Sequence, residues 1–402
     1  MIKIESKMNF IRNINFGHVE IASKGVNWLY IPFLAIMIEP NILGEIILIQ
    51  SIVAILSSAM LFGQNRVVLK FTSIDNSSAI YTSLIIITAI SMLLMIGAFF
   101  LRYDVGFIIF ATYLITIHSI FCLTLRANEK LKSFLFLRLS HVIIRLFSGC
   151  FLVVLYKSPI FYIVGDVIGV FISFIIYFVK NKNDMRGLQA IKKSFHDNIS
   201  KYTLFGVPLF LQALLASLST NIDRFILDKN GYSSDLGVYG IIVTISSSIV
   251  FILAYYAVLF EVVIYRSKNN EEANAVSSTF LKKSILTSML VSPILFLTYY
   301  MIYLINPALG FYPLTFLIFI ISNILMSVYL KYSYICSFVN KTNLILIASL
   351  VLAFLTVIFN YILIPTYGID GASWSKLSAL CLTLLIMKFN FFNPFKLYGS
   401  KN

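Results

Sequence analysis

The stretch FLFLRLSHVIIRLFSGCFLVVLY, residues 134–156, decides the fold class of this chain. It is long and apolar enough to cross a bilayer as a helix, which takes ~20 residues at a rise of about 1.5 Å each. It nevertheless contains Arg138, His141 and Arg145, whose spacing of three and four residues places them on one face of a helix. A charged side chain at membrane depth costs at least ~2.5 kcal/mol, so it usually faces a bundle interior or a water-filled cavity.

Two interpretations of this basic stripe (Arg138, His141 and Arg145) remain open. In the first, the stripe is the cationic wall of an internal cavity that receives an anion. In the second, Arg138 and His141 lie at the membrane interface while Arg145 snorkels or pairs structurally. No acidic residue lies within the stretch, and Asp166 lies beyond its end. The sequence therefore predicts no carboxylate partner for Arg145 and favours an anionic ligand.

The composition of the whole chain is that of an integral membrane protein. Of its 402 residues 59% are hydrophobic and 12% are charged, and the mean hydropathy is +0.91. Soluble domains carry about 25% charged residues. Twelve apolar segments follow one another, at approximately 20–38, 45–63, 79–101, 105–125, 134–156, 159–179, 203–222, 237–263, 284–304, 311–333, 342–364 and 370–390. Lipid offers no partner to backbone groups, and the alternation of barrel strands is missing, so we expect an all-α integral membrane protein.

The basic residues indicate how the segments are oriented. All but six of the 31 Lys and Arg residues lie in the tails, in alternate connections or at the segment ends beside them, all on one side. The positive-inside rule therefore predicts that both termini are cytoplasmic. The net charge of +14 belongs to a membrane surface, and no nucleic-acid partner is expected.

The domain organisation follows from the connection of residues 180–201, which is the longest and most charged. It divides the segments into six plus six, which is typical of a transporter with two repeated halves. We expect an N-terminal six-helix lobe at 1–179, a cytoplasmic linker at 180–201 and a C-terminal six-helix lobe at 202–402. A short internal echo agrees, because Leu43-Gly44 opens the second segment and Leu236-Gly237 opens the eighth.

Further polar residues within the segments are candidates for the site. Lys24 and Asn27 are three residues apart in the first segment and can face one cavity, although Lys24 is equally compatible with interfacial snorkelling. Pro32 removes a backbone hydrogen bond and predicts a kink in the same segment. Asp223 and Arg224, at the outer end of the seventh segment, form either a helix-end ion pair or a gate.

Two more charged or titratable positions remain. Lys376 lies inside the twelfth segment, and Asp166 and Asp370 are the carboxylates expected to compensate its charge. His118, in the fourth segment, is either a satisfied core histidine or a group that takes part in proton coupling.

Three stretches carry a resemblance to a known family. They are PNILGEI at 40–46, GVPLFLQALLASLSTNIDRFILDKNGYSSDLGVYG at 206–240 and FNYILIPTYGIDGASWS at 359–375. They resemble the polysaccharide-transporter branch of the multidrug/oligosaccharidyl-lipid/polysaccharide (MOP) flippase superfamily, and the chain looks like an O-antigen flippase of the Wzx type.

The resemblance implies a MATE-like fold, with two pseudo-symmetric six-helix bundles in a V around a central cavity. It implies a protein of the bacterial cytoplasmic (inner) membrane. The expected substrate is an undecaprenyl-pyrophosphate-linked oligosaccharide, an O-antigen or capsule repeat unit, moved outward by alternating access. A gradient of Na⁺ or H⁺ would drive it, and a polysaccharide polymerase and a chain-length regulator are the implied partners.

Two rival functions are weighed against this one. A MATE-type multidrug or cation antiporter needs carboxylates in its cavity. The segments hold few acidic residues, and these lie at segment ends: Asp166, Asp223 and Glu261. An enzyme acting on lipid-linked sugars needs a sizeable external loop, and the longest one, around residues 228–235, carries no metal-ligand spacing. We therefore expect a transporter without a cofactor.

Overall fold

A computed structural model describes residues 16–71, 76–99, 103–180, 195–232, 234–265, 267–339 and 341–391. Within these ranges the regular elements are all helices. They are α1 (Phe16–Trp28), α2 (Tyr30–Met37), α3 (Pro40–Leu61), α4 (Gln64–Phe71), α5 (Asn76–Phe99), α6 (Tyr103–Ala127), α7 (Leu131–Tyr156), α8 (Ile160–Lys180), α9 (Phe195–Lys229), α10 (Asp235–Ser246), α11 (Ser248–Tyr265), α12 (Asn270–Ile305), the 3₁₀ turn η3 (Pro307–Leu309), α13 (Pro313–Phe338) and α14 (Thr342–Phe391).

The helices account for all twelve apolar segments. Ten helical stretches of the described residues are long and apolar enough to cross a membrane, and one of them, Asn343–Lys388, contains two of the segments. The shorter apolar stretch Ile21–Met37 supplies the first segment. The prediction of an all-α, multi-pass membrane protein is confirmed. The predicted cytoplasmic linker at residues 180–201 lies mostly outside the described residues.

Two of the crossings change direction where the sequence predicts a break. Pro32 has no N–H to give to the carbonyl of Trp28, and α1 ends at Trp28 before α2 begins at Tyr30. Within α14 the backbone folds at Gly368, whose φ of 56° lies in the left-handed region. A Cβ on Gly371 would lie 2.2 Å from the carbonyl oxygen of Leu363, so only glycine fits the close approach after this turn.

Helix α4 was not among the predicted elements. Its residues follow the second segment and contain Arg66 and Lys70, which made them resemble a basic connection. In the structure Val67, Val68 and Phe71 are buried, with Phe71 stacked beside Tyr202 of α9 at a ring distance of 4.9 Å. This short amphipathic helix therefore links α3 and α5 to the beginning of α9.

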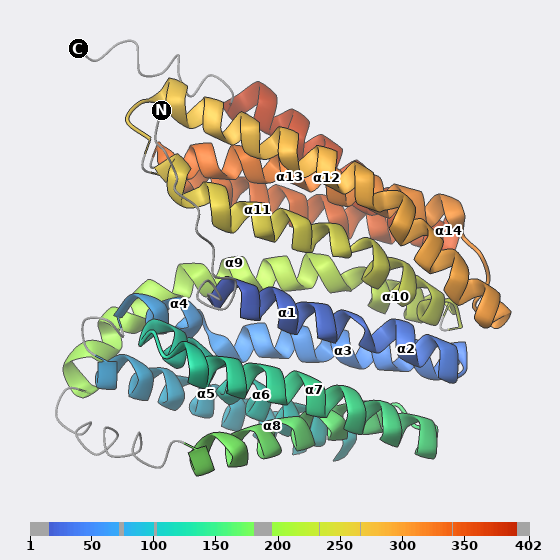
Figure 1. The fold of residues 1–402 in the computed structure, drawn as a ribbon, viewed down its shortest axis with the longest axis horizontal. Coiled ribbons are helices and arrows are strands. Elements are labelled where there is room, and N and C mark those ends of the chain that lie inside the picture. Colours follow the sequence, from blue (N-terminus) through green and yellow to red (C-terminus); the bar gives the residue numbers. More distant parts are fainter. Residues whose placement is uncertain are drawn as a thin grey trace, which may run out of the picture.

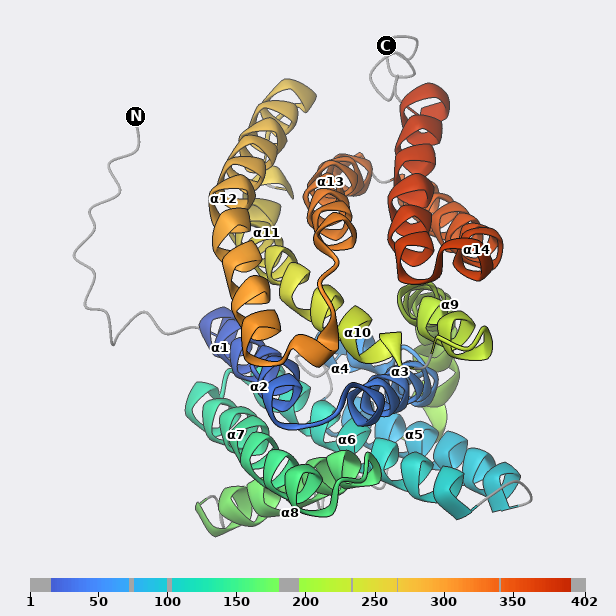
Figure 2. The ribbon, with the colours of Figure 1, turned by 90° about the vertical axis from the view of Figure 1, so that its right-hand side faces the viewer.

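Figures 1 and 2 show α1–α8 in one half of the molecule and α10–α14 in the other, with α9 passing between them. The halves diverge toward the end where α1 begins and α14 ends, which the charge pattern predicts to be cytoplasmic (Figure 1). At the opposite end, called the outer end below, α3 packs against α10 and α2 packs against α10 and α12. The V shape agrees with the expected fold, and the lobe boundaries at 179 and 202 stay a prediction.

Glycines allow α3 and α10 to approach closely at the outer end. A Cβ on Gly237 would lie 2.4 Å from the carbonyl oxygen of Pro40, and one on Gly240 would lie 1.8 Å from Cδ1 of Ile47. Real Cβ atoms essentially never come within 3.0 Å of another heavy atom. The outer end is therefore closed by a contact that leaves no room for a side chain at Gly237, while one at Gly240 would have to displace the side chain of Ile47.

Candidate transport site

The basic stripe lies on α7, which forms an antiparallel hairpin with α8. Arg145 places its Nε 2.7 Å from Oδ1 of Asp166, whose side chain is only 3% exposed. The prediction that Arg145 has no carboxylate partner was wrong. Asp166 lies beyond the end of α7 in the sequence, but the turn after Tyr156 brings α8 back along α7 and returns this carboxylate to membrane depth.

Close packing of α7 and α8 makes this ion pair. A Cβ on Gly165 would lie 2.4 Å from Cα of Gly149, and one on Gly169 would lie 3.0 Å from the carbonyl oxygen of His141. Gly165 and Gly169 are four residues apart, the spacing that lets helices touch inside a membrane. This Gly-x-x-x-Gly pattern, which begins one residue before Asp166, is the signal that could have revealed the partner of Arg145.

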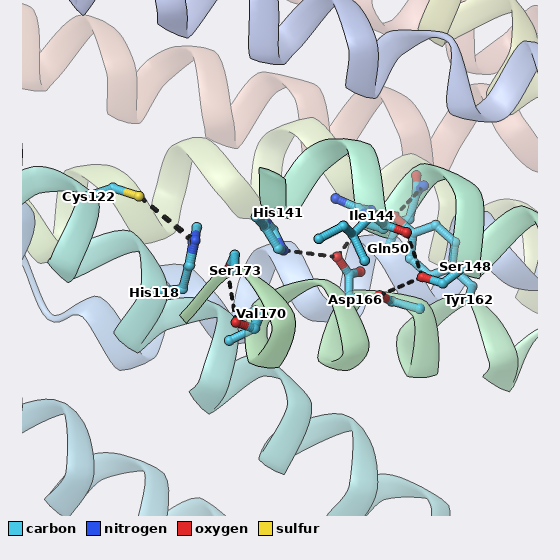
Figure 3. A network of polar contacts seen from close by, with 12 residues as sticks. Gln50, His118, Cys122, His141, Ile144, Ser148, Tyr162, Asp166, Val170 and Ser173 are labelled. Carbon is cyan, nitrogen blue, oxygen red and sulfur yellow. Dashed lines mark hydrogen bonds and ion pairs between the residues drawn. The ribbon is translucent and has the colours of Figure 1, made fainter. Parts of the chain in front are cut away.

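The guanidinium of Arg145 is also held by aromatic residues. It donates a hydrogen bond to the hydroxyl of Tyr162, and its Cζ lies 5.0 Å from the Tyr162 ring and 5.6 Å from the Tyr30 ring. Gln50 of α3 donates to the same Tyr162 hydroxyl at 2.8 Å (Figure 3). Tyr162 and Gln50 were not singled out in the sequence, where nothing distinguishes them from an interfacial tyrosine and a single buried amide.

Two histidines extend the buried polar group (Figure 3). Nε2 of His141 lies 3.9 Å from Oδ1 of Asp166, and the rings of His141 and His118 are 4.4 Å apart. His118 contacts the carbonyl oxygen of Leu137 through Nε2 at 3.3 Å, and both histidines are buried. Arg138 lies within electrostatic range of both rings. The stripe therefore faces the interior of its own half, between α6, α7 and α8.

The other two predicted cationic-site residues lie elsewhere. Lys24 and Asn27 line a cavity of about 290 Å³ between the halves, which is formed by α1 and α3 on one side and by α10 and α11 on the other. Gln50, Thr244 and Ser247 add polar groups to its wall. The structure thus divides the predicted set: Lys24 and Asn27 line the cavity, and Arg145 stands behind it, connected through Tyr162 and Gln50.

A second polar group lies in the other half, around Asp223 and Arg224. Asp223 accepts hydrogen bonds from the Tyr239 hydroxyl and, at 2.9 Å, from the backbone N–H of Arg224. The Arg224 guanidinium instead donates to Oγ of Ser51, on α3 of the opposite half, at 2.8 Å. Neighbouring positions of a helix do not face each other, so the two side chains diverge. Arg224 therefore bridges the two halves. Of the two predicted alternatives, the helix-end ion pair is corrected, and the gate stays a prediction.

Lys376 belongs to the same polar group. Its Nζ donates to Oδ1 of Asn323 at 3.2 Å and lies 4.9 Å from the ring centre of Phe319. The prediction that Asp166 or Asp370 compensates this charge was wrong. Asp166 pairs with Arg145 in the other half, and Asp370 accepts a hydrogen bond from Thr315. The carboxylate within electrostatic range of Lys376 is Asp223, from α9.

Comparison with known proteins gives the fold a name. No protein-family model and no curated sequence matches the chain. A solved structure titled as the inward-facing conformation of a multidrug resistance MATE family transporter of the MOP superfamily matches with a TM-score of 0.72 at 13% identity, covering 94% of this chain and 96% of that one. The lipid II flippase MurJ, in an inward closed conformation, matches with a TM-score of 0.69 at 15% identity, covering 92% and 86%.

A third solved structure shares the fold. An outward-facing MATE transporter of the MOP superfamily gives a TM-score of 0.63 at 13% identity over 92% of this chain and 91% of that one, below the 0.72 of the inward-facing structure. The chain has the MOP-transporter fold.

Proposed function

We propose that this protein is a flippase, which moves an undecaprenyl-pyrophosphate-linked oligosaccharide from the inner to the outer leaflet of the bacterial cytoplasmic membrane. The observation that carries the proposal is the cavity between the halves. Of the described residues that line it none is acidic, while Lys24 supplies a positive charge and Asn27, Gln50, Thr244 and Ser247 supply hydrogen-bonding groups. Such a wall suits a phosphate bearing sugars, because a cation attracts the phosphate and uncharged polar groups bind hydroxyls.

Arg145 and the rest of the basic stripe do not line the cavity but position residues of its wall. The Arg145 guanidinium is neutralised by Asp166 and so adds little net charge, but it orients the Tyr162 hydroxyl toward Gln50 on the cavity wall. We assign Arg138, His141 and Arg145 this supporting role, in place of direct contact with the phosphate. Asp166 is the structural counter-ion.

Arg224 forms the outer gate in this proposal. Its bond to Ser51, the residue after the cavity-lining Gln50, joins the halves beside the cavity and must break when the halves separate there. Asp223 accepts a hydrogen bond from the backbone N–H of Arg224 and so belongs to the gate on the side of the C-terminal half. Alternating access would then open the outer end as the cytoplasmic end closes, driven by an H⁺ or Na⁺ gradient.

The alternative with the same fold is a MATE-type multidrug or cation antiporter. A cation site needs carboxylates on the cavity wall, and none of the described residues that line the cavity is acidic. Asp166 and Asp223 are engaged by Arg145 and Tyr239. We expect a deletion strain to lose surface polysaccharide and to accumulate the lipid-linked unit on the cytoplasmic side. Normal surface glycan together with drug sensitivity would favour the antiporter. Associated polymerase and chain-length regulator proteins are the partners this function would require.

A further inference from the structure

An apolar groove lies at the seam between the halves, beside the cavity that contains Lys24. It has a volume of about 670 Å³ and is formed by α1 and α2, by α7 and by α12. Phe147 and Phe151 of α7 line it with exposed fractions of 70% and 66%, and Thr298 and Ile302 of α12 close its far side. Figure 2 shows these helices as neighbours along one flank of the molecule. The groove therefore combines surfaces of both halves.

Trp28 separates the apolar groove from the polar cavity. It lines both of them, and its Nε1 donates a hydrogen bond of 2.8 Å to the carbonyl oxygen of Thr244 on the opposite half. An indole ring suits this place because its body is apolar and its N–H needs one polar partner. The cavity and the groove are thus adjacent compartments of opposite polarity, and the side chain of Trp28 lines both.

The backbone at Trp28 is interrupted. Pro32 leaves the Trp28 carbonyl without its helical donor, and the N–H of Leu29 is shared between the carbonyls of Gly25 and Val26 at 3.3 and 3.2 Å. A break of this kind lets α1 and α2 change their relative angle with few hydrogen bonds to lose. The residue that divides the two compartments therefore stands at a hinge.

We propose that the groove holds the polyprenyl chain of the substrate while the pyrophosphate and sugars occupy the cavity, with Trp28 as the divider between them. This inference rests on the proposed function. A lipid-linked head group in the cavity carries a hydrocarbon chain that must leave through an apolar opening, because burial in a polar wall would forfeit ~25 cal/mol per Å² of apolar surface. The groove is the apolar compartment that shares a wall with the cavity. The occupant of the groove is the polyprenyl chain of the substrate. The test below distinguishes it from bulk phospholipid.

The test uses a pyrophosphate-linked oligosaccharide whose polyprenyl chain carries a photoreactive diazirine, with the full-length protein in vesicles. We expect labelling of α2 and of the α7 segment around Phe147 and Phe151, and we expect excess unlabelled lipid-linked oligosaccharide to suppress it several-fold. A phospholipid with a diazirine in its acyl chain should label the lipid-facing side of α8 as well, without such suppression. Labelling of groove and α8 to the same extent, or labelling that unlabelled substrate leaves unchanged, would overturn the proposal.

Two matched substitutions provide a functional readout in the same vesicles. Val154→Trp fills the groove, and Ile175→Trp places the same ring on the lipid-facing surface of α8, where Ile175 is 59% exposed. We expect Val154→Trp to slow flipping several-fold and Ile175→Trp to leave it unchanged at equal protein abundance. Equal rates would contradict the groove assignment. If the wild-type protein flips no lipid-linked oligosaccharide, the proposed function fails; if it flips while the chain labels another surface, only this inference fails.

Discussion

The contact of Gly237 with Pro40 makes the closed outer end sensitive to a single methyl group. In Gly237→Ala the new Cβ would lie 2.4 Å from a backbone carbonyl oxygen, whereas ordinary contacts begin at 3.4 Å. Helices α3 and α10 must therefore separate by roughly 1 Å, and overpacking of this kind costs ~1–3 kcal/mol. Because the clash exists only when the outer end is closed, the population ratio should shift toward the outward-open state by about 5- to 150-fold.

The control variant is Gly106→Ala on α6, where nothing lies within 4 Å of the new Cβ. Both substitutions gain the helix preference of alanine, about 0.5–1 kcal/mol over glycine, so their difference isolates the clash. Spin labels at Lys157 and Lys229, exposed residues at the outer end of the two halves, report the separation by pulsed electron resonance in a variant without native cysteines.

We expect longer distances for Gly237→Ala than for Gly106→Ala and the parent. A companion variant, Gly240→Ala, would meet the side chain of Ile47, at Cδ1 and Cγ1, and should be rescued by Ile47→Ala. Identical distance distributions for Gly237→Ala and Gly106→Ala would refute the idea that this contact holds the outer end closed.

Three further predictions concern the polar groups. Asp166→Asn should lower the free energy of unfolding by ~3–5 kcal/mol, since it leaves Arg145 buried without a counter-ion, whereas the double variant with Arg145→Gln should recover part of the loss in thermal unfolding measurements. Tyr239→Phe removes the hydroxyl donor of the half-buried Asp223 and should cost ~1–3 kcal/mol in the same measurement; an unchanged melting temperature would show that another donor replaces it. Lys24→Gln should reduce flipping without altering stability, because this side chain is exposed to the cavity, and full complementation of surface glycan at matched abundance would remove Lys24 from the site.

The sequence by itself determined the crossings and where they break. Lipid forces each apolar run of sufficient length to satisfy its backbone as a helix, so composition and length suffice to locate the spans. The break before Pro32 and the turn near Gly368 follow from local backbone chemistry, which needs no knowledge of neighbouring helices. The basic stripe on residues 134–156 also follows from helical spacing alone.

Only the tertiary structure decided which partner each polar side chain meets. In water a helix reveals its buried face by its pattern of polar residues, but lipid tails are as apolar as leucine, so the lipid-facing and the packed sides of a membrane helix look alike in sequence. Arg145 pairs with Asp166 because glycines let α7 and α8 come into contact. Arg224 hydrogen-bonds to Ser51, 173 residues away in the sequence, because α9 lies against α3 of the other half. Such pairings depend on the register between helices, which packing fixes and hydropathy does not encode.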